Sequence, residues 1–284
     1  MNQMIQVKNL NYQYPNTSNL AIKGINFSIA KGEVFGFLGP SGSGKSTTQK
    51  ILFKLLTGYN GMAQIDGKEV NVWGKDLYEK IGVGFELPNH YLKLTALENL
   101  TFFKNFYNKT HNPMELLDMV GLKKDANKKV GDFSKGMKMR LNFVRSFLHD
   151  PEILFLDEPT SGLDPVNSKV VKDIIVDLKS KGKTIFITTH QMYDAEKLCD
   201  RVAFIVDGEI KAMDSPENLK INHSNRSVEV LFRNSVDKEK FQLDGLGQNK
   251  TFLEKLQSNE IETIHSKEAS LDDIFIQVTG KTLV

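Results

Sequence analysis

A run of small and polar residues holds the pattern G-x-x-x-x-G-K-[ST], which is typical of loops that bind phosphate groups. The run consists of Gly39, Pro40, Ser41, Gly42, Ser43, Gly44, Lys45, Ser46 and Thr47. Glycines allow successive backbone N–H groups to turn toward phosphate oxygens, while Lys45 can reach the β- and γ-phosphates and the Ser46 hydroxyl can bind Mg²⁺. The sequence therefore predicts a nucleotide site, and a flexible Gly/Ser turn is the alternative.

Two adjacent carboxylates follow an apolar segment farther along the chain. Residues 153–156 are short and apolar, as expected of a buried strand, and Asp157 and Glu158 come directly after them. At the end of such a strand Asp157 can hold the Mg²⁺ that Ser46 touches, and Glu158 can polarise an attacking water as a general base. An acidic, solvated strand end is the alternative. Downstream of a phosphate loop, the pair favours hydrolysis of a bound nucleotide.

The elements that must position these residues alternate between strands and helices. A strand expected at 33–38 precedes the phosphate loop, and a helix expected at 45–57 follows it. Short apolar segments rich in β-formers lie at 153–156, 184–188 and 202–206. A helix expected at 168–181 separates the first two of them. This alternation predicts an α/β fold with a mostly parallel sheet.

A mostly helical region is expected from about residue 87 to residue 149. The sequence T-A-L-E at 95–98 predicts a capped helix start, and Ser134 predicts another. Beyond residue 222 the chain reads as a small α+β extension. We therefore expect one domain at 1–222, with the helical region inserted in it, and an accessory domain at 223–284.

Bulk properties restrict the class of protein only loosely. The formal net charge is +2, from 37 basic and 35 acidic residues, which gives no argument for nucleic acid binding. The single cysteine, Cys199, allows no internal disulfide and fits a reducing compartment. No signal peptide is expected at the first residues. The apolar runs are far shorter than the roughly 18 residues that span a bilayer, so another chain would have to supply any membrane spans.

Further motifs follow in the order found in ABC-type ATPases, and the chain resembles that family over roughly residues 4–222. The sequence S-G-L-D at 161–164, which ends in Asp164, resembles the D-loop that bridges two subunits. His190 closes an expected strand and resembles the switch histidine that contacts the γ-phosphate. The sequence F-S-K-G-M at 133–137 stands where the family has its L-S-G-G-Q signature, which caps the ATP held by the partner subunit.

The resemblance also implies roles at positions where this sequence departs from the family pattern, and at one position where two residues could fill the same role. Ser134 and Gly136 would act in the signature, although Lys135 and Met137 replace a glycine and the glutamine. Glu86 falls where most members carry the Q-loop glutamine, and as a carboxylate it can still bind Mg²⁺. Tyr14 is expected to stack on adenine, because bases stack on flat rings, and Tyr12 is its competitor.

The aromatic residues of the helical region allow two interpretations. They are Phe102, Phe103, Phe106 and Tyr107. In the ABC family this region receives a helix of the membrane subunit, so the stretch could be part of that contact. Core packing is the alternative, and the sequence leaves both open.

The resemblance implies the fold of an ABC-type P-loop nucleotide-binding domain, with a mostly parallel sheet, an antiparallel β layer and a helical subdomain. It further implies ATP and Mg²⁺, a homodimer or a heterodimer with a second ATP-binding subunit, and a transmembrane permease in a separate chain. The place of action would be the cytoplasmic face of the cell membrane, with no nucleic acid partner. The end of the chain, L-D-D-I-F-I-Q-V-T-G, resembles an extension found on ATPase subunits of ABC-2 exporters.

Two other functions stay open at this level. One is a soluble ABC ATPase that works outside transport, as in translation or DNA repair. The other is a regulatory subunit that binds ATP and hydrolyses it weakly.

Overall fold

The computed structural model describes residues 3–223, 227–233, 235–267 and 269–281. Contacts divide the chain into a first unit up to Met213 and a second unit from Asp214 onward. The sequence analysis predicted this boundary after residue 222. The contacts place it earlier, because helix α8 (Pro216–His223) packs against helix α10 (Leu271–Thr279) of the second unit.

A six-stranded sheet forms the centre of the first unit, in the order β10-β9-β3-β8-β7-β6. Its strands are β3 (Val34–Leu38), β6 (Ile81–Gly84), β7 (Ile153–Asp157), β8 (Thr184–Thr189), β9 (Arg201–Val206) and β10 (Glu209–Asp214). Strand β3 pairs in parallel with β8 and β9, and β7 pairs in parallel with β6 and β8. The carboxyl ends of β3, β6, β7 and β8 therefore meet at one edge, and the expected mostly parallel α/β fold is confirmed.

A second sheet is antiparallel and has the order β2-β1-β4-β5. Its strands are β1 (Gln3–Gln13), β2 (Leu20–Ala30), β4 (Asn60–Ile65) and β5 (Lys68–Glu69). Alternate residues at 25–30 of β2 are buried, as expected of a strand with one face on a core. This sheet is the antiparallel β layer that the resemblance implied.

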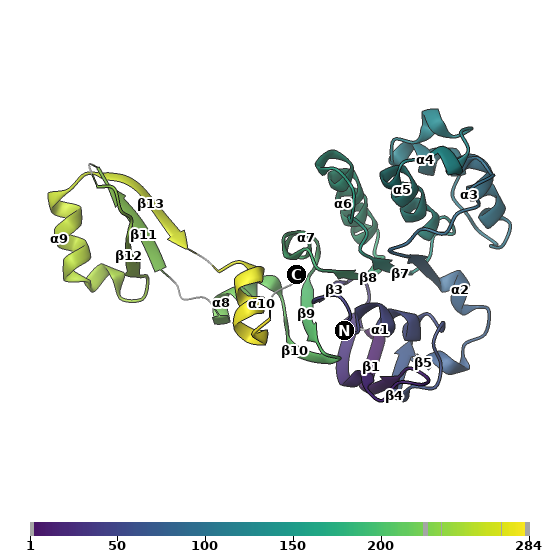
Figure 1. Ribbon diagram of the computed structural model, residues 1–284, viewed down its shortest axis with the longest axis horizontal. Helices are drawn as coiled ribbons and strands as arrows, with labels where there is room; N and C mark the ends of the chain where they lie inside the picture. Colours follow the sequence, from purple (N-terminus) through teal and green to yellow (C-terminus); the bar gives the residue numbers. More distant parts are fainter. Residues whose placement is uncertain (1–2, 224–226, 234, 268, 282–284) are drawn as a thin grey trace. The chain divides into compact units, whose positions relative to one another are not determined.

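Seven α-helices complete the first unit as the structure describes it. They are α1 (Lys45–Leu52), α2 (Leu77–Lys80), α3 (Ala96–Lys104), α4 (Pro113–Met119), α5 (Lys135–Ser146), α6 (Pro165–Ser180) and α7 (Met192–Leu198). Helices α3, α4 and α5 lie together and contact one another, which confirms the helical subdomain (Figure 1). Thr95 forms a complete capping box with Glu98, and Ser134 caps α5, as the sequence predicted.

Helix α1 is shorter than the sequence predicted. It ends at Leu52 rather than near residue 57, because Phe53 leaves helical geometry and Lys54 takes a left-handed conformation with φ of 60°. The Lys54 ammonium donates a hydrogen bond to the Trp73 carbonyl, a contact between distant parts of the chain. The helical pattern of the sequence continues here, and tertiary contacts override it.

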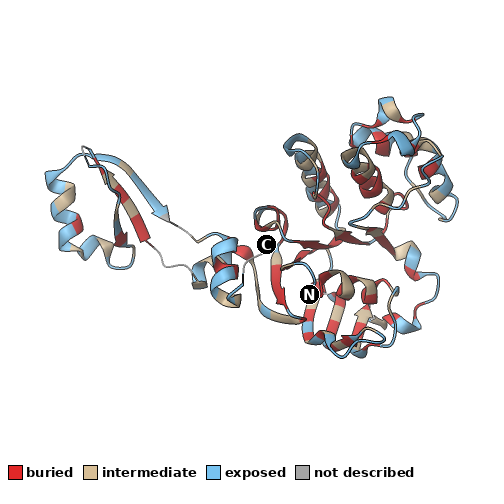
Figure 2. Ribbon diagram, in the orientation of Figure 1, coloured by how far each residue is buried: buried red, intermediate tan, exposed pale blue. Residues whose placement is uncertain are grey.

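The core of the first unit is aromatic. The rings of Phe27, Phe35, Phe37, Phe155 and Phe186 pack together between the two sheets. Figure 2 shows that the central strands are buried along their length, and every residue of β3 and β8 is buried. Gly36 of β3 allows Cys199 to approach, since a Cβ at this position would lie 2.8 Å from its sulfur.

The second unit is a small α+β body, as the sequence predicted. Strands β11 (Ser227–Phe232), β12 (Glu239–Gln242) and β13 (Ile261–Lys267) form an antiparallel sheet in the order β12-β11-β13. Helix α9 (Lys250–Ser258) contributes Phe252 to a core with Val228, Val230 and Phe241. Across the described ranges of both units, no helix has the length and apolar character needed to cross a membrane.

We expect Phe186→Ala to lower the free energy of unfolding of the first unit by about 3–5 kcal/mol, because it leaves a cavity among four other rings. A urea titration followed by tryptophan fluorescence measures this, since Trp73 is the only tryptophan and is buried in the first unit. The control is Val176→Ala on the exposed side of α6, which should cost less than about 1 kcal/mol. Equal losses for the two variants would contradict the prediction.

Candidate functional site

The phosphate loop lies between β3 and α1, as the sequence predicted, and its glycines are required by its shape. Gly42 and Gly44 have φ of 78° and 109°, values that other residues rarely adopt. At Gly39 a Cβ would lie 2.1 Å from the Ile205 carbonyl oxygen, so only glycine fits. The loop is thus pressed against the end of β9, with its backbone free to turn N–H groups toward an anion.

Lys45 folds back over this loop. Its Nζ donates hydrogen bonds to the carbonyl oxygens of Gly39 (2.6 Å) and Pro40 (3.0 Å). Burial lowers the pKa of Lys45, and the negative charges of Glu158, Asp157 and Glu86 oppose this shift. These three carboxylates come from the ends of β7 and β6, so the parallel sheet brings together residues that are far apart in the sequence.

Glu158 is held in one position by its surroundings. It is 6% exposed, and its Oε1 lies 2.8 Å from His190 Nδ1. The Thr189 hydroxyl donates a 3.0 Å hydrogen bond to the other carboxylate oxygen. Its backbone has φ of 49°, a strained value for a residue with a side chain, and such strain often occurs at functional sites. The structure thus places Glu158 and His190 in direct contact, a pairing that the sequence analysis did not predict.

Thr188 and Thr189 are residues that the sequence analysis did not single out. The Thr188 hydroxyl donates a hydrogen bond to the Asp157 carboxylate, and Thr189 does the same to Glu158. Both threonines end strand β8, directly before His190. Their position directly before His190 could have marked them as candidate site residues. Their hydrogen-bond partners, however, follow only from the pairing of β7 with β8.

The residues of the loop also show whether phosphate and Mg²⁺ would fit. The Ser43 hydroxyl is buried and has no hydrogen-bond partner among the described residues, as expected of a group that awaits an anion. Ser46 at the start of α1 is only partly buried, and Asp157 ends β7, which β8 separates from β3 in the sheet. Within the described ranges no three His, Cys, Asp or Glu side chains form a ready metal site. Hydroxyl and carboxylate oxygens nevertheless suit Mg²⁺, which binds few protein groups together with phosphate oxygens.

The two candidate tyrosines differ in their surroundings. Tyr12 is 4% exposed and belongs to the hydrophobic core. Tyr14 is partly exposed, and its hydroxyl shares a 3.0 Å hydrogen bond with that of Thr47 in α1. The Tyr14 ring therefore lies beside the phosphate loop, with the Tyr12 ring edge-on against it at 5.0 Å.

The signature-like residues lie in a second group. Ser134 caps α5 by accepting a hydrogen bond from the Met137 N–H (3.2 Å), and Asp164 caps α6 by accepting from the N–H groups of Val166 and Asn167. Lys135 and Gly136 contact the loop before α6, at Gly162 and Leu163. For the described residues, no hydrogen bond joins this group to Lys45 or its carboxylates. One chain thus presents two separate half-sites.

Two family models match the sequence. The model of the ABC transporter family matches residues 22–161, which lie in the first unit. The model of the fluoroquinolone efflux ABC transporter C-terminal domain matches residues 226–268, which lie in the second unit.

Relatives are similar along nearly the whole chain. A fluoroquinolones export ATP-binding protein of Mycobacterium tuberculosis is 55% identical over 285 residues, which is 99% of this chain and 95% of the relative. The bacitracin transport ATP-binding protein of Bacillus licheniformis is 33% identical over 306 residues, covering 99% of this chain and 98% of the relative. Both are transport proteins, which favours transport over an ABC ATPase that works outside it.

Solved structures of ATP-binding proteins are similar in fold to this chain. The ATP-binding subunit of an ABC transporter superposes with a TM-score of 0.71 and 28% identity, covering 77% of this chain and 92% of that one. A dimeric ATP-binding cassette in a post-hydrolysis state, bound to ADP and Pi, gives a TM-score of 0.69 and 30% identity, covering 75% and 98%. The similarity along nearly the whole chain shows that this protein belongs to the ATP-binding subunits of ABC transporters and is an ATPase.

Proposed function

We propose that two such subunits close around Mg²⁺-ATP and use its hydrolysis to drive export through a separate membrane-spanning subunit. The observation that carries the hydrolytic step is the meeting of Lys45, Asp157 and Glu158 behind the phosphate loop, with His190 on Glu158. Export is supported by the name of the relative from Mycobacterium tuberculosis, a fluoroquinolones export ATP-binding protein. The 55% identity to a fluoroquinolones export protein makes a fluoroquinolone-like compound our candidate substrate.

The phosphate loop holds the triphosphate. Lys45 releases the carbonyl oxygens of Gly39 and Pro40 and donates to the β- and γ-phosphates instead. The Ser43 hydroxyl and the N–H groups at the start of α1 bind the remaining oxygens, helped by the helix dipole. The Tyr14 ring stacks on adenine, with its orientation fixed by Thr47.

Glu158 acts on the attacking water. Its carboxylate accepts a proton as the water approaches the γ-phosphate, and Thr189 and His190 keep it aimed at that point. Ser46, Asp157 and Glu86 would hold Mg²⁺, which would offset the negative charge of the β- and γ-phosphates. Thr188 keeps the Asp157 carboxylate directed at this position.

The second half-site serves the partner subunit. Ser134 and Gly136 at the start of α5, with Asp164 at the start of α6, complete the pocket formed by Lys45 of the other chain. The separation of the two half-sites within one chain supports this arrangement, and so does the dimeric structure of a similar cassette. We place the assembled protein on the cytoplasmic face of the membrane, bound to its permease.

We expect Glu158→Gln to lower ATP turnover at least about 100-fold, because the amide cannot take the proton from water. The variant should also accumulate as an ATP-bound dimer, visible by size-exclusion chromatography with ATP. Glu115→Gln on the exposed surface of α4 is the control and should behave as the unchanged protein. A Glu158→Gln protein that still turns over ATP would exclude this residue as the base.

Mixing two inactive variants tests the shared pocket. Lys45→Ala removes the phosphate ligand and Ser134→Phe blocks the signature, so each homodimer should be inactive. A mixed dimer keeps one intact pocket, and a 1:1 mixture should recover about a quarter of the normal ATPase activity if subunits exchange freely and pockets act independently. No recovery, with mixed dimers demonstrated by two different tags, would contradict the shared pocket.

The transport function is tested by capture of the tagged chain from gently solubilised native membranes. We expect a membrane protein with several spans in near-equal amount, and greater accumulation of a fluoroquinolone in cells that lack the chain. A chain recovered without any membrane protein would overturn the transport role and leave the ATPase chemistry intact. Capture of a permease without any change in drug accumulation would overturn only the proposed substrate.

A further inference from the structure

A buried carboxylate lies one helical turn beyond His190, outside the nucleotide site. It belongs to Asp194, which is 6% exposed and stands in the first turn of helix α7. Its Oδ2 accepts a 2.8 Å hydrogen bond from the hydroxyl of Thr160, which is also buried. Its Oδ1 lies 2.7 Å from the ammonium of Lys172 in helix α6. Three separate segments of the chain therefore meet at this one carboxylate.

The ionised Asp194 needs both of these partners. The side chain of Asp194 is 8% exposed and that of Lys172 is 22% exposed, so solvent screens their attraction little. A buried charge is costly unless it is paired and hydrogen-bonded. Lys172 supplies the opposite charge at one oxygen, and Thr160 supplies a donor at the other. With its two oxygens bound to two different segments, the carboxylate is fixed in one orientation.

Helix α7 depends on such an anchor. It has seven residues, and an isolated helix of that length is marginal in water. Gln191 precedes it and, within the described chain, makes no side-chain cap hydrogen bond. His190 comes directly before Gln191, and its half-exposed ring meets Glu158 at 2.8 Å. The position of His190 therefore depends on what holds the first turn of α7.

The contact of Asp194 with Thr160 accompanies the contact of His190 with Glu158. Thr160 follows Glu158 by two positions, with Pro159 between them, and Asp194 follows His190 by four. Both contacts measure 2.8 Å. The two segments are thus tied at two points, and the proline ring restricts the backbone between the ties on one side. A shift of α7 that would carry His190 away from Glu158 is opposed by the second tie.

We propose that Asp194 is a positioning residue that holds His190 against Glu158. It acts through its hydrogen bond with Thr160, while Lys172 keeps its carboxylate in place. The inference rests on the proposed roles of Glu158 and His190 in hydrolysis, and it adds the group that keeps the histidine in position. Loss of Asp194 should slow turnover and leave ATP binding unchanged, because the phosphate loop contains none of these residues.

The first experiment removes the hydroxyl of Thr160 and keeps the shape of the side chain. Thr160→Val should lower kcat for ATP hydrolysis about tenfold or more, because a small misplacement of a catalytic group is costly. The KM for ATP should change less than about twofold, since nucleotide binding is untouched. Thr160→Ser keeps the hydroxyl and should have nearly normal kcat. A valine variant with normal kcat, or a serine variant as slow as the valine one, would overturn the proposal.

The ion pair is tested with two lysines of α6. Lys172→Met should lower kcat about fivefold or more, because the buried carboxylate of Asp194 loses its counter-ion and its fixed orientation. Lys169→Met is the matched control, since Lys169 pairs with Asp173 at 2.9 Å and both side chains are exposed. An exposed pair of this kind contributes little, so the control should keep its kcat. Equal kcat values for the two variants would count against the proposal.

A double-variant cycle shows whether the effect passes through His190. Adding Thr160→Val to His190→Ala should lower the residual kcat less than about twofold, because the group to be positioned is already gone. Two groups that act independently would instead multiply their effects. A further tenfold loss in the double variant would therefore exclude the route from Thr160 through His190.

A final measurement needs no turnover. In protein made with isotope-labelled histidine, NMR gives a signal for Nδ1 of His190, identified by its absence from His190→Ala. We expect Thr160→Val to move this signal and to leave that of a distant histidine, His149, unchanged. An unmoved His190 signal would overturn the positioning role. Normal turnover in Glu158→Gln would instead overturn the proposed base, and the shift of the His190 signal would still report the tie.

Discussion

The ammonium group of Lys45 must stay charged although it is largely enclosed by protein, and much of the structure follows from this requirement. Burial alone favours the neutral amine. The carboxylates of Glu158, Asp157 and Glu86 oppose that effect, and carbonyl oxygens of the phosphate loop accept its hydrogen bonds. These groups can meet only because β3, β6 and β7 run in the same direction and end at the same edge of the sheet.

The same sheet also fixes the positions of the carboxylates in the nucleotide site. Thr188 and Thr189 of β8 each hold a carboxylate at the end of the neighbouring strand β7, and the strained backbone of Glu158 is held by its N–H bond to the Thr188 carbonyl (2.9 Å). Geometry of this kind is fixed before substrate arrives, so little reorganisation is left for the reaction itself. For the described residues, no hydrogen bond links the starts of α5 and α6 to this cluster.

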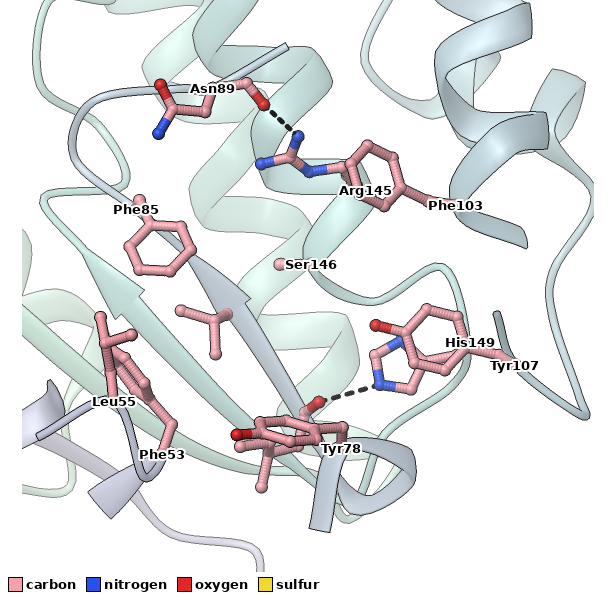
Figure 3. A pocket seen from close by; sticks show the side chains of 12 residues that line it. Phe53, Leu55, Tyr78, Phe85, Asn89, Phe103, Tyr107, Arg145, Ser146 and His149 are labelled. Carbon is pink, nitrogen blue, oxygen red and sulfur yellow. Dashed lines mark hydrogen bonds between the residues drawn. The ribbon is translucent and has the colours of Figure 1, made fainter. Parts of the chain in front are cut away.

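The helical subdomain adds a second kind of constraint. Helix α5 begins at the signature-like residues and ends beside a cavity of about 370 Å³ that Arg145 lines (Figure 3). One helix therefore joins the signature-like residues to the wall of this cavity. Phe85 and Asn89, on either side of Glu86 in the sequence, line the same cavity.

Local patterns in the sequence determined the phosphate loop, the strand that ends in Asp157, the helix caps at Thr95 and Ser134, and the alternation that makes the sheet parallel. Each depends on neighbours within a few residues, so composition and spacing are enough. Tertiary structure alone decided that Tyr12 is buried while Tyr14 faces the loop, that α1 stops at Leu52, and that Arg145 has no counter-ion within the described chain. These outcomes depend on contacts between residues far apart in the sequence, whose partners are set by strand order and packing rather than by any local preference.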